Sequence, residues 1–318
     1  MKELRRDPIT NDIVVLAKNR SKRPMDKVDN QNDKEVIQEY RKDCPFCRGN
    51  EKYTEKCTFE LKGEDGWLVR SVYNKFPIVD SLSEEIFGHH EVMIDTNRHN
   101  GNFYNMSEEE FFYLLKMYKD RYVFMAKNEQ VKYISIFKNF LRRAGASLIH
   151  PHSQIISLSI VPPEVENEIN ISKRYYEKNN KSLYEHIIES ELKYQERVIH
   201  DHKDYLLVVP EIAKYGGEIR LFFKTKKRFE ELKETELKEL GIILERLFKK
   251  MYEVHGYNPF NICIHTHPIN TDEKHEEHFR THIHIIPRKY SFGGFELSTD
   301  LYVSSINANE LAKKLRFD

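Results

Sequence analysis

Two histidine pairs in similar surroundings decide the predicted fold. The first pair stands in the segment Gly145-Ala-Ser-Leu-Ile-His150-Pro-His152-Ser-Gln154-Ile-Ile156, and the second is His282-Ile-His284. Each pair closes the same pattern of strand, loop, strand, long helix, strand and strand. The pairs lie 132 residues apart, and the first strands of the two patterns, at Trp67 and Tyr205, lie 138 residues apart. Offsets this similar indicate a duplicated domain rather than an array of short repeats.

The two long helices occupy matching places in the two patterns. Ser107 and Glu110 form a capping box that begins the first helix, and the spacing of apolar residues extends it to about Asn128. The second helix begins near Thr235 and ends at Gly256. We therefore predict an α+β fold of two tandem halves, residues 1–165 and 166–318, each an antiparallel sheet with a long helix.

The composition excludes several classes of protein. The chain has 318 residues, with 51 Lys and Arg against 51 Asp and Glu, so no net positive field attracts nucleic acid. No stretch approaches 18 consecutive apolar residues, which argues against a membrane span, and the N-terminus has no secretory pattern. Four cysteines do not make a disulfide scaffold, so we expect a reducing, cytoplasmic location. The unusual number is 15 histidines.

The first histidine pair lies among apolar residues. If residues 147–160 form a strand, the alternate side chains of His150, His152 and Gln154 share one face at steps of about 7 Å. Three polar side chains on one face of an otherwise apolar strand are costly to bury without a function. A solvent-exposed strand edge is the alternative, and the flanking isoleucines argue against it.

The segment Cys44-Pro-Phe-Cys47 predicts a metal site. Its spacing lets two thiolates reach one tetrahedral zinc ion. A redox pair is the alternative, but no thioredoxin-like strand and helix surround the segment. His99 and His150 are candidates for the two remaining ligands, and His89 and His90 compete with them.

The second histidine pair also predicts a metal site. His282 and His284 share one strand face, and His265 and His267 stand close upstream. Ile286 takes the place of the glutamine, so this half keeps the histidines and lacks the amide. We interpret the group as a second, structural metal site, and a pair of exposed strand histidines is the alternative.

Other polar clusters are typical of ordinary surface. His275 and His278 lie in a charged loop, and we expect solvent to surround them. The basic stretches Arg5–Pro8 and Arg20–Pro24 are typical of a solvated face, although arginine also pairs with phosphate through two donors.

Together these motifs resemble the galactose-1-phosphate uridylyltransferase family, a branch of the histidine-triad superfamily. The resemblance covers nearly the whole chain. Its motifs, in order, are Arg5-Arg-Asp-Pro-Ile-Thr10, Arg20–Pro24, Cys44–Cys47, Asn74-Lys-Phe-Pro77, His90-Glu-Val92, His99, Phe137–Gln154, Glu196-Arg197, Glu218, His265 and His282–His284. Several spaced motifs in the right order are far more specific than any one of them. The serine form of the motif, with Ser153, also occurs among ADP-sugar and diadenosine polyphosphate phosphorylases.

The resemblance implies a homodimer of chains that each hold two histidine-triad-like halves. It implies zinc on Cys44, Cys47, His99 and His150, and a second metal, zinc or iron, on Glu168, His265, His282 and His284. The substrate-binding residues that it implies are Arg20, Arg23, Asn74, Asn139, Gly145, Ser147 and Ser153.

The implied reaction is nucleotidyl transfer through a covalent intermediate. His152 attacks the α-phosphorus of a nucleoside diphosphate sugar, sugar 1-phosphate leaves, and a second acceptor attacks the nucleotidyl-histidine. Gln154 donates a hydrogen bond to a phosphoryl oxygen as charge develops there. The resemblance predicts uridylyl transfer from UDP-glucose to galactose 1-phosphate.

Two alternatives stay open. The first is phosphorolysis of ADP-glucose or a dinucleoside polyphosphate, with inorganic phosphate as the acceptor. The second is a non-catalytic, zinc-stabilised nucleotide-binding protein. The presence of both His152 and Gln154 argues against the second alternative, because a site without turnover would be free to lose them.

Overall fold

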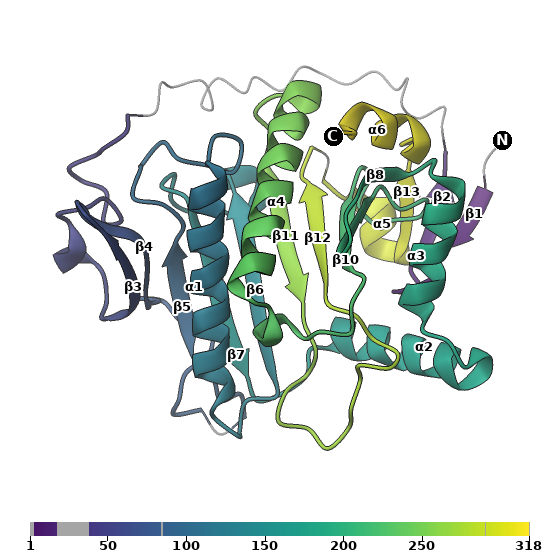
Figure 1. Ribbon diagram of the computed structural model, residues 1–318, viewed down its shortest axis with the longest axis horizontal. Coiled ribbons are helices and arrows are strands. Elements are labelled where there is room, and N and C mark those ends of the chain that lie inside the picture. Colours follow the sequence, from purple (N-terminus) through teal and green to yellow (C-terminus); the bar gives the residue numbers. More distant parts are fainter. Residues whose placement is uncertain (1–2, 18–37, 84, 290, 318) are drawn as a thin grey trace.

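The computed structural model describes residues 3–17, 38–83, 85–289 and 291–317. Arg20 and Arg23, two of the predicted substrate-binding residues, lie outside these ranges. The described chain is built around one large antiparallel sheet (Figure 1). In spatial order its strands are β3 (Cys57–Gly63), β4 (Gly66–Tyr73), β5 (His90–Ile94), β7 (His152–Leu158), β6 (Tyr133–Phe140), β11 (Phe260–His265), β12 (His282–Pro287), β10 (Ile219–Phe223), β9 (Tyr205–Val208) and β8 (Val198–Asp201).

The strand order repeats on either side of one central pair. From β6 outward the order is β7, β5, β4 and β3, and from β11 outward it is β12, β10, β9 and β8. The two halves join where β6 and β11 pair, with Phe140 opposite Phe260 and Ile136 opposite Ile264. This arrangement confirms the predicted α+β fold of two similar halves. The boundary predicted at residues 165 and 166 stays a prediction.

Two long helices cover one face of the sheet. Helices α1 (Glu108–Ala126) and α4 (Glu234–His255) lie side by side in front of the strands (Figure 1). The predicted capping box of Ser107 and Glu110 begins α1. The helices approach closely at Gly241, where a Cβ atom would lie 3.3 Å from the backbone oxygen of Glu108. A larger residue there would push the two helices apart.

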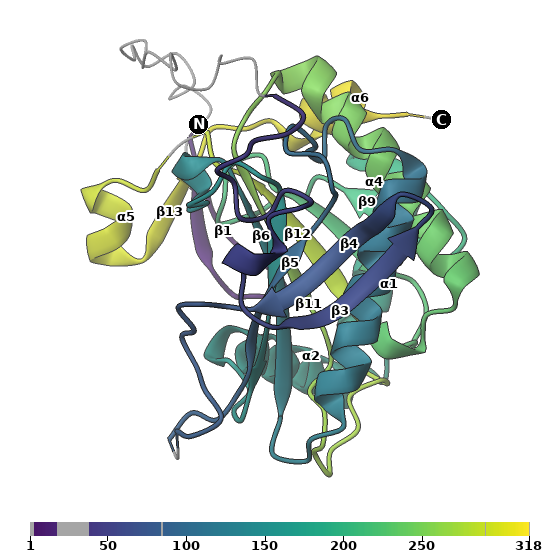
Figure 2. The ribbon, with the colours of Figure 1, turned by 90° about the vertical axis from the view of Figure 1, so that its left-hand side faces the viewer.

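The other face of the sheet carries smaller elements. Figure 2 shows α2, α5, β1 and β13 on the side opposite α1 and α4. A small sheet there is formed by β1 (Glu3–Arg6), β2 (Ile13–Leu16) and β13 (Leu301–Ser304). The remaining described helices are α2 (Pro163–Asn179), α3 (Leu183–Tyr194), α5 (Gly294–Thr299) and α6 (Ala308–Leu315). Of these, α6 packs against α4 and joins the core beneath it. Three short 3-10 turns complete the described elements: η3 (Glu51–Tyr53), η4 (Arg142–Ala144) and η5 (Phe229–Glu231).

Alternation along the strands separates an apolar face from a polar one. In β7 and β12, Ile155, Ile283 and Ile285 are buried in the core beneath α1 and α4. Neighbouring side chains of a strand point to opposite faces. The side chains of His152 and His282 therefore lie on the face opposite the two long helices.

The strand that carries the first histidine pair is shorter than predicted. It begins at His152, while His150 and Pro151 belong to the preceding loop. Proline has no backbone N–H to add to a sheet ladder. The carbonyl of Pro151 instead accepts a hydrogen bond from the backbone N–H of Asp95. His150 is fully buried although Ile149 beside it is half exposed.

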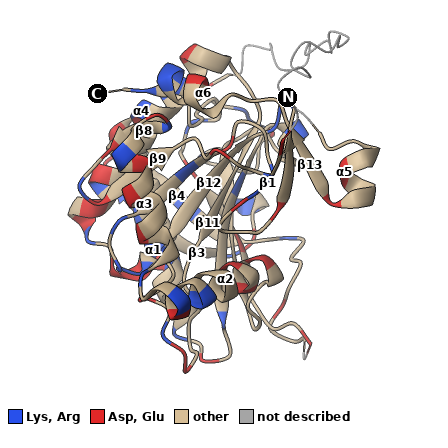
Figure 3. Ribbon diagram, turned by 90° about the vertical axis from the view of Figure 1, so that its right-hand side faces the viewer, with Lys and Arg blue, Asp and Glu red and all other residues tan. Residues whose placement is uncertain are grey.

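The surface of the described chain mixes charges of both signs. Lys and Arg stand beside Asp and Glu along α2 and α3 (Figure 3). None of the described helices is long and apolar enough to cross a bilayer.

A buried ion pair joins β5 to α1. Glu91 Oε1 lies 2.6 Å from Arg121 Nη2, and both side chains are almost fully buried. The other carboxylate oxygen of Glu91 accepts hydrogen bonds from the hydroxyl groups of Thr58 and Ser71. Removing one partner of such a pair leaves a buried charge without its counter-charge.

We predict that Arg121→Met lowers the free energy of unfolding by about 3–5 kcal/mol, because Glu91 loses its buried counter-ion. Urea denaturation measures this. Lys116→Met is the matched control, since Lys116 pairs with the exposed Glu234 and its loss should cost no more than about 1 kcal/mol. Equal losses of unfolding free energy in the two variants would show that the buried pair stabilises the fold no more than the exposed pair does.

Candidate active site and metal clusters

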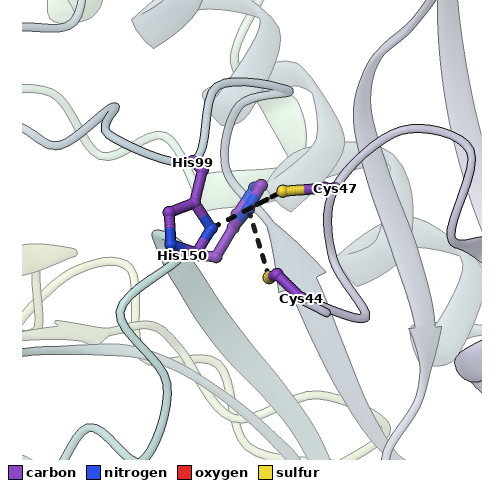
Figure 4. Close-up of side chains that lie close together, drawn as sticks. All are labelled: Cys44, Cys47, His99 and His150. Carbon is purple, nitrogen blue, oxygen red and sulfur yellow. Dashed lines mark hydrogen bonds between the residues drawn. The ribbon is translucent and has the colours of Figure 1, made fainter. Parts of the chain in front are cut away.

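Four side chains from three segments meet beside the start of β7. The sulfur atoms of Cys44 and Cys47 face the rings of His99 and His150 (Figure 4). Cys47 Sγ lies 3.5 Å from His99 Nδ1 and 3.6 Å from His150 Nδ1, and Cys44 Sγ lies 3.8 Å from His150 Nδ1. All four potential ligand atoms lie within 4.8 Å of one another. The structure thus brings together the four residues of the first predicted metal site.

The geometry of this cluster fits a tetrahedral ion. A metal about 2.3 Å from sulfur and about 2.0 Å from nitrogen places tetrahedral ligands about 3.6 Å apart. The carbonyl of Thr96 lies 2.9 Å from His150 Nε2, so that nitrogen carries the proton and Nδ1 keeps its lone pair. Burial lowers the pKa of His150 to about 3, which keeps the ring neutral, the form that binds metal.

His152 presents one ring nitrogen with a free lone pair. Its Nδ1 lies 2.9 Å from the carbonyl oxygen of His150, and a carbonyl can only accept, so Nδ1 carries the proton. The lone pair then sits on Nε2, which can act as a nucleophile. Burial lowers the pKa of His152 and favours this neutral ring. Beneath the strand, Lys138 pairs with Asp95 and donates to the carbonyl oxygen of His152 at 3.2 Å.

His90, one of the competing candidates for the first metal site, orients Gln154 instead. The backbone N–H of Ile78 donates to His90 Nδ1 at 3.3 Å, which puts the ring proton on Nε2. That nitrogen lies 2.8 Å from Gln154 Oε1, so the amide N–H₂ of Gln154 remains to donate elsewhere. The Nδ2 of Asn74 lies 3.0 Å from the same ring nitrogen. Neither His89 nor His90 belongs to the Cys–His cluster.

The sequence did not assign this role to His90. The signal lies in the pairing of β5 with β7, where Val92 is opposite Gln154 and His90 is opposite Ile156. Residues two apart on one strand share a face, so His90 lies on the same face as Gln154. The contact between His90 and Gln154 therefore depends on the register of β5 and β7, two strands that are far apart in the sequence.

Asn139, one of the predicted substrate residues of the 139–147 segment, borders a cavity on the polar face. This cavity, of about 320 Å³, is lined by residues that include Asn139 and Asn261. Asn261 Nδ2 donates to Asn139 Oδ1 at 2.7 Å and to the carbonyl oxygen of Ala144 at 2.8 Å. These bonds anchor the loop that contains Gly145, whose φ of +96° few other residues adopt. Ser147 follows on the exposed part of the loop.

Ser153 differs from the other predicted substrate residues. Its side chain lies on the helical face of the sheet, where the hydroxyl of Tyr118 donates to Ser153 Oγ at 2.5 Å. The residue is 1% exposed. The structure therefore does not bring the Ser153 side chain to the face of His152 and Gln154, because adjacent residues of a strand point in opposite directions.

A second cluster gathers four side chains around α2, β11 and β12. Glu168 Oε2 lies 2.9 Å from His265 Nδ1 and 3.6 Å from His282 Nε2, and Glu168 Oε1 lies 4.0 Å from His284 Nε2. Their potential ligand atoms all lie within 4.8 Å of one another. The structure thus brings together the residues of the second predicted metal site.

The donors of this second cluster also suit a cation. Within the described chain, Glu168 Oε1, His282 Nε2 and His284 Nε2 are buried and have no hydrogen-bond partner. His284 Nδ1 lies 2.8 Å from Glu218, a carboxylate–histidine pair that leaves Nε2 free for a metal. Burial alone would raise the pKa of Glu168, but the charges of His265 and His282 hold it well below its usual range.

Comparisons with known proteins found matches to both halves of the chain. A family model described as the N-terminal domain of DUF4931, a domain of unknown function, matches residues 26–161. A model described as the C-terminal domain of galactose-1-phosphate uridyl transferase matches residues 168–291. An ADP-glucose phosphorylase of Arabidopsis thaliana is 29% identical over 99% of this chain and 92% of its own. A galactose-1-phosphate uridylyltransferase of Thermotoga maritima is 27% identical over 99% of this chain and 98% of its own.

Solved structures show the same likeness. The structure of an ADP-glucose phosphorylase of Arabidopsis thaliana with bound ADP-glucose has a TM-score of 0.87 at 28% identity, covering 100% of this chain and 99% of its own. A uridylyltransferase structure has a TM-score of 0.74 at 22% identity, covering 99% and 97%, and shows that the fold is shared.

We predict that Cys44→Ala releases about one equivalent of metal per chain, because a tetrahedral site loses one of its four ligands. Elemental analysis of the purified protein measures the metal content. Cys57→Ala is the matched control, since Cys57 lies outside both clusters and should leave the metal content unchanged. Unchanged metal content in the Cys44 variant would contradict metal binding by this cluster.

Proposed function

Because the chain belongs to the galactose-1-phosphate uridylyltransferase family of the histidine-triad superfamily, we propose that it transfers a nucleotidyl group through a covalent intermediate on His152. The predicted class, a nucleotidyltransferase, agrees with the names of its relatives. The observation that supports the role of His152 is its bond to the His150 carbonyl, which leaves Nε2 with a lone pair.

In the first half-reaction, Nε2 of His152 attacks the α-phosphorus of a nucleoside diphosphate sugar. A bond forms between nitrogen and phosphorus, the phosphoanhydride bond breaks, and sugar 1-phosphate leaves with the electron pair. The imidazole becomes positively charged at this point, and its Nδ1–H still donates to the carbonyl of His150. That carbonyl dipole stabilises the charge. The amide of Gln154, held by His90, donates to a phosphoryl oxygen.

In the second half-reaction, a phosphate oxygen of the acceptor attacks the same phosphorus. The bond between phosphorus and Nε2 breaks, and its electron pair returns to Nε2, which restores the neutral imidazole. Splitting the exchange into two steps lets one site serve donor and acceptor in turn. Asn74, Asn139, Gly145 and Ser147 would contact the nucleotide, together with Arg20 and Arg23. Ser153 would contribute through its backbone, since its side chain bonds Tyr118.

In this proposal the metal ions have a structural role and fix the positions of side chains in the site. Two thiolates and two histidines favour zinc at Cys44, Cys47, His99 and His150. When bound, zinc would supply a fixed anchor for the His150 ring, and the carbonyl of the same residue positions His152. We propose a second zinc or an iron at Glu168, His265, His282 and His284, with a structural role.

Two pairs of substrates fit this chemistry. The first is UDP-glucose with galactose 1-phosphate, the activity named for relatives that match nearly the whole chain, such as that of Thermotoga maritima. The second is ADP-glucose with inorganic phosphate, which is favoured by the TM-score of 0.87 to a structure containing ADP-glucose. We also propose that the protein acts as a homodimer in the cytoplasm.

The donor can be identified by labelling. Incubation with UDP-glucose or ADP-glucose, each without acceptor, should add one nucleotidyl group to His152 with one of them, because the first half-reaction needs no acceptor. Intact-mass and peptide mass spectrometry measure the adduct. Labelling by UDP-glucose would support uridylyl transfer, and labelling by ADP-glucose alone would support the phosphorylase. No adduct from either donor would contradict the proposed mechanism.

We predict that His152→Gly abolishes the adduct and lowers exchange on the order of a thousandfold or more, as expected for loss of a covalent nucleophile. Its metal content should stay at the wild-type value, because His152 lies outside both clusters. His186→Gly, on α3, is the matched control and should retain exchange. If the His152 variant still catalysed nucleotidyl exchange, His152 would not be the nucleophile.

A further inference from the structure

The loop between β11 and β12, residues 266–281, holds a third group of potential ligands. Atoms of Glu273, His275 and His278 lie within 4.8 Å of one another, and none of these residues belongs to the two clusters described above. The expectation that solvent surrounds His275 and His278 is wrong, since each is only 5% exposed. The loop contacts α2, where Ser172 Oγ lies 3.1 Å from His278 Nδ1, and the ring of His275 packs edge-on against that of His278.

His275 has a buried nitrogen that nothing in the described chain satisfies. Its Nδ1 is inaccessible to solvent and has no hydrogen-bond partner among the described residues. Buried polar atoms in folded proteins are nearly always paired, so an unpaired one needs an explanation. A cation bound to this nitrogen would supply the missing partner.

His278 is held in the tautomer that a metal requires. The hydroxyl of Ser172 donates to the carbonyl oxygen of Ile169 at 2.9 Å, so its single proton is already used. The same oxygen lies 3.1 Å from His278 Nδ1 and can only accept there, which places the ring proton on Nδ1. Nε2 of His278 therefore carries the lone pair, as in histidines that bind metal through Nε2.

Glu273 completes the group with a carboxylate. Lys173 Nζ lies 2.5 Å from Oε1, and this ion pair holds the side chain against α2. Two imidazoles and one carboxylate suit zinc better than the hard cations magnesium and calcium, which prefer oxygen ligands alone. We infer that Glu273, His275 and His278 form a third metal site, which binds a divalent cation of the zinc class with water as a fourth ligand.

The position of this site ties it to the second cluster. Glu168 and Ser172 stand one turn apart on α2, so the same helix face serves both groups. The loop itself begins after His265 and ends at His282, two members of the second cluster. A cation at Glu273, His275 and His278 would therefore fasten the loop to α2 and restrain the strand ends that carry those histidines.

The test counts metal ions and does not depend on activity. Wild type and variants are passed from zinc-containing buffer through a desalting column, and elemental analysis gives zinc per chain. Glu273→Gln and His275→Gln should each bind about one equivalent less than wild type, or release it at least about tenfold more readily to a chromophoric chelator. Glu273 is exposed, so its variant should fold even if the His275 variant does not.

Two controls separate this site from the others. His200→Gln, on β8 and outside every cluster, should keep the wild-type zinc content. Cobalt loading of Cys44→Ala should remove the thiolate-to-cobalt absorption, while Glu273→Gln should retain that band and lose only intensity from nitrogen and oxygen ligands. Zinc content and release that are the same in wild type, Glu273→Gln and His275→Gln would overturn the third site.

Discussion

The proposed active site depends on His150, which makes one contact through its ring and another through its backbone carbonyl. The ring of His150 reaches the sulfur atoms of Cys44 and Cys47, and its carbonyl oxygen fixes the tautomer of His152. A shift of the His150 backbone would therefore disturb the Cys–His cluster and the ring of His152 together. The Pro151 that follows ends the loop and allows β7 to begin at His152. The Cys–His cluster, the loop and the ring of His152 are thus structurally coupled.

The two halves share a strand order but differ in the residues on the polar face. In the first half, cysteines reach the histidine from a distant loop, and Gln154 follows the pair. In the second half, Glu168 reaches from α2, and Ile286 takes the place of the glutamine. Both halves bury the same kind of apolar face beneath α1 and α4. The shared core preserves the fold while the opposite face is free to diverge.

The helices and strands could be predicted from the sequence, because they depend on local patterns of apolar and capping residues. The two four-residue clusters could be predicted from the family resemblance. The capping box at Ser107 and the strand periodicities depend only on near neighbours. The role of His90 depends on cross-strand register, and the burial of His275 and His278 depends on a loop packing against a helix. Such contacts join residues far apart in the chain, so a charged loop predicts exposure even where the fold removes it.

The alternation of faces along β7 also limits how this protein can evolve. His152 and Ser153 are adjacent, yet one lies on the polar face and the other bonds Tyr118 beneath the helices. Inserting one residue between Pro151 and His152, with the preceding loop held in place, would move the following side chains of β7 to the opposite faces. The ring of His152 would then point into the core, and the hydroxyl of Ser153 would lie on the polar face. A change of chain length inside β7 therefore alters which side chains reach the polar face.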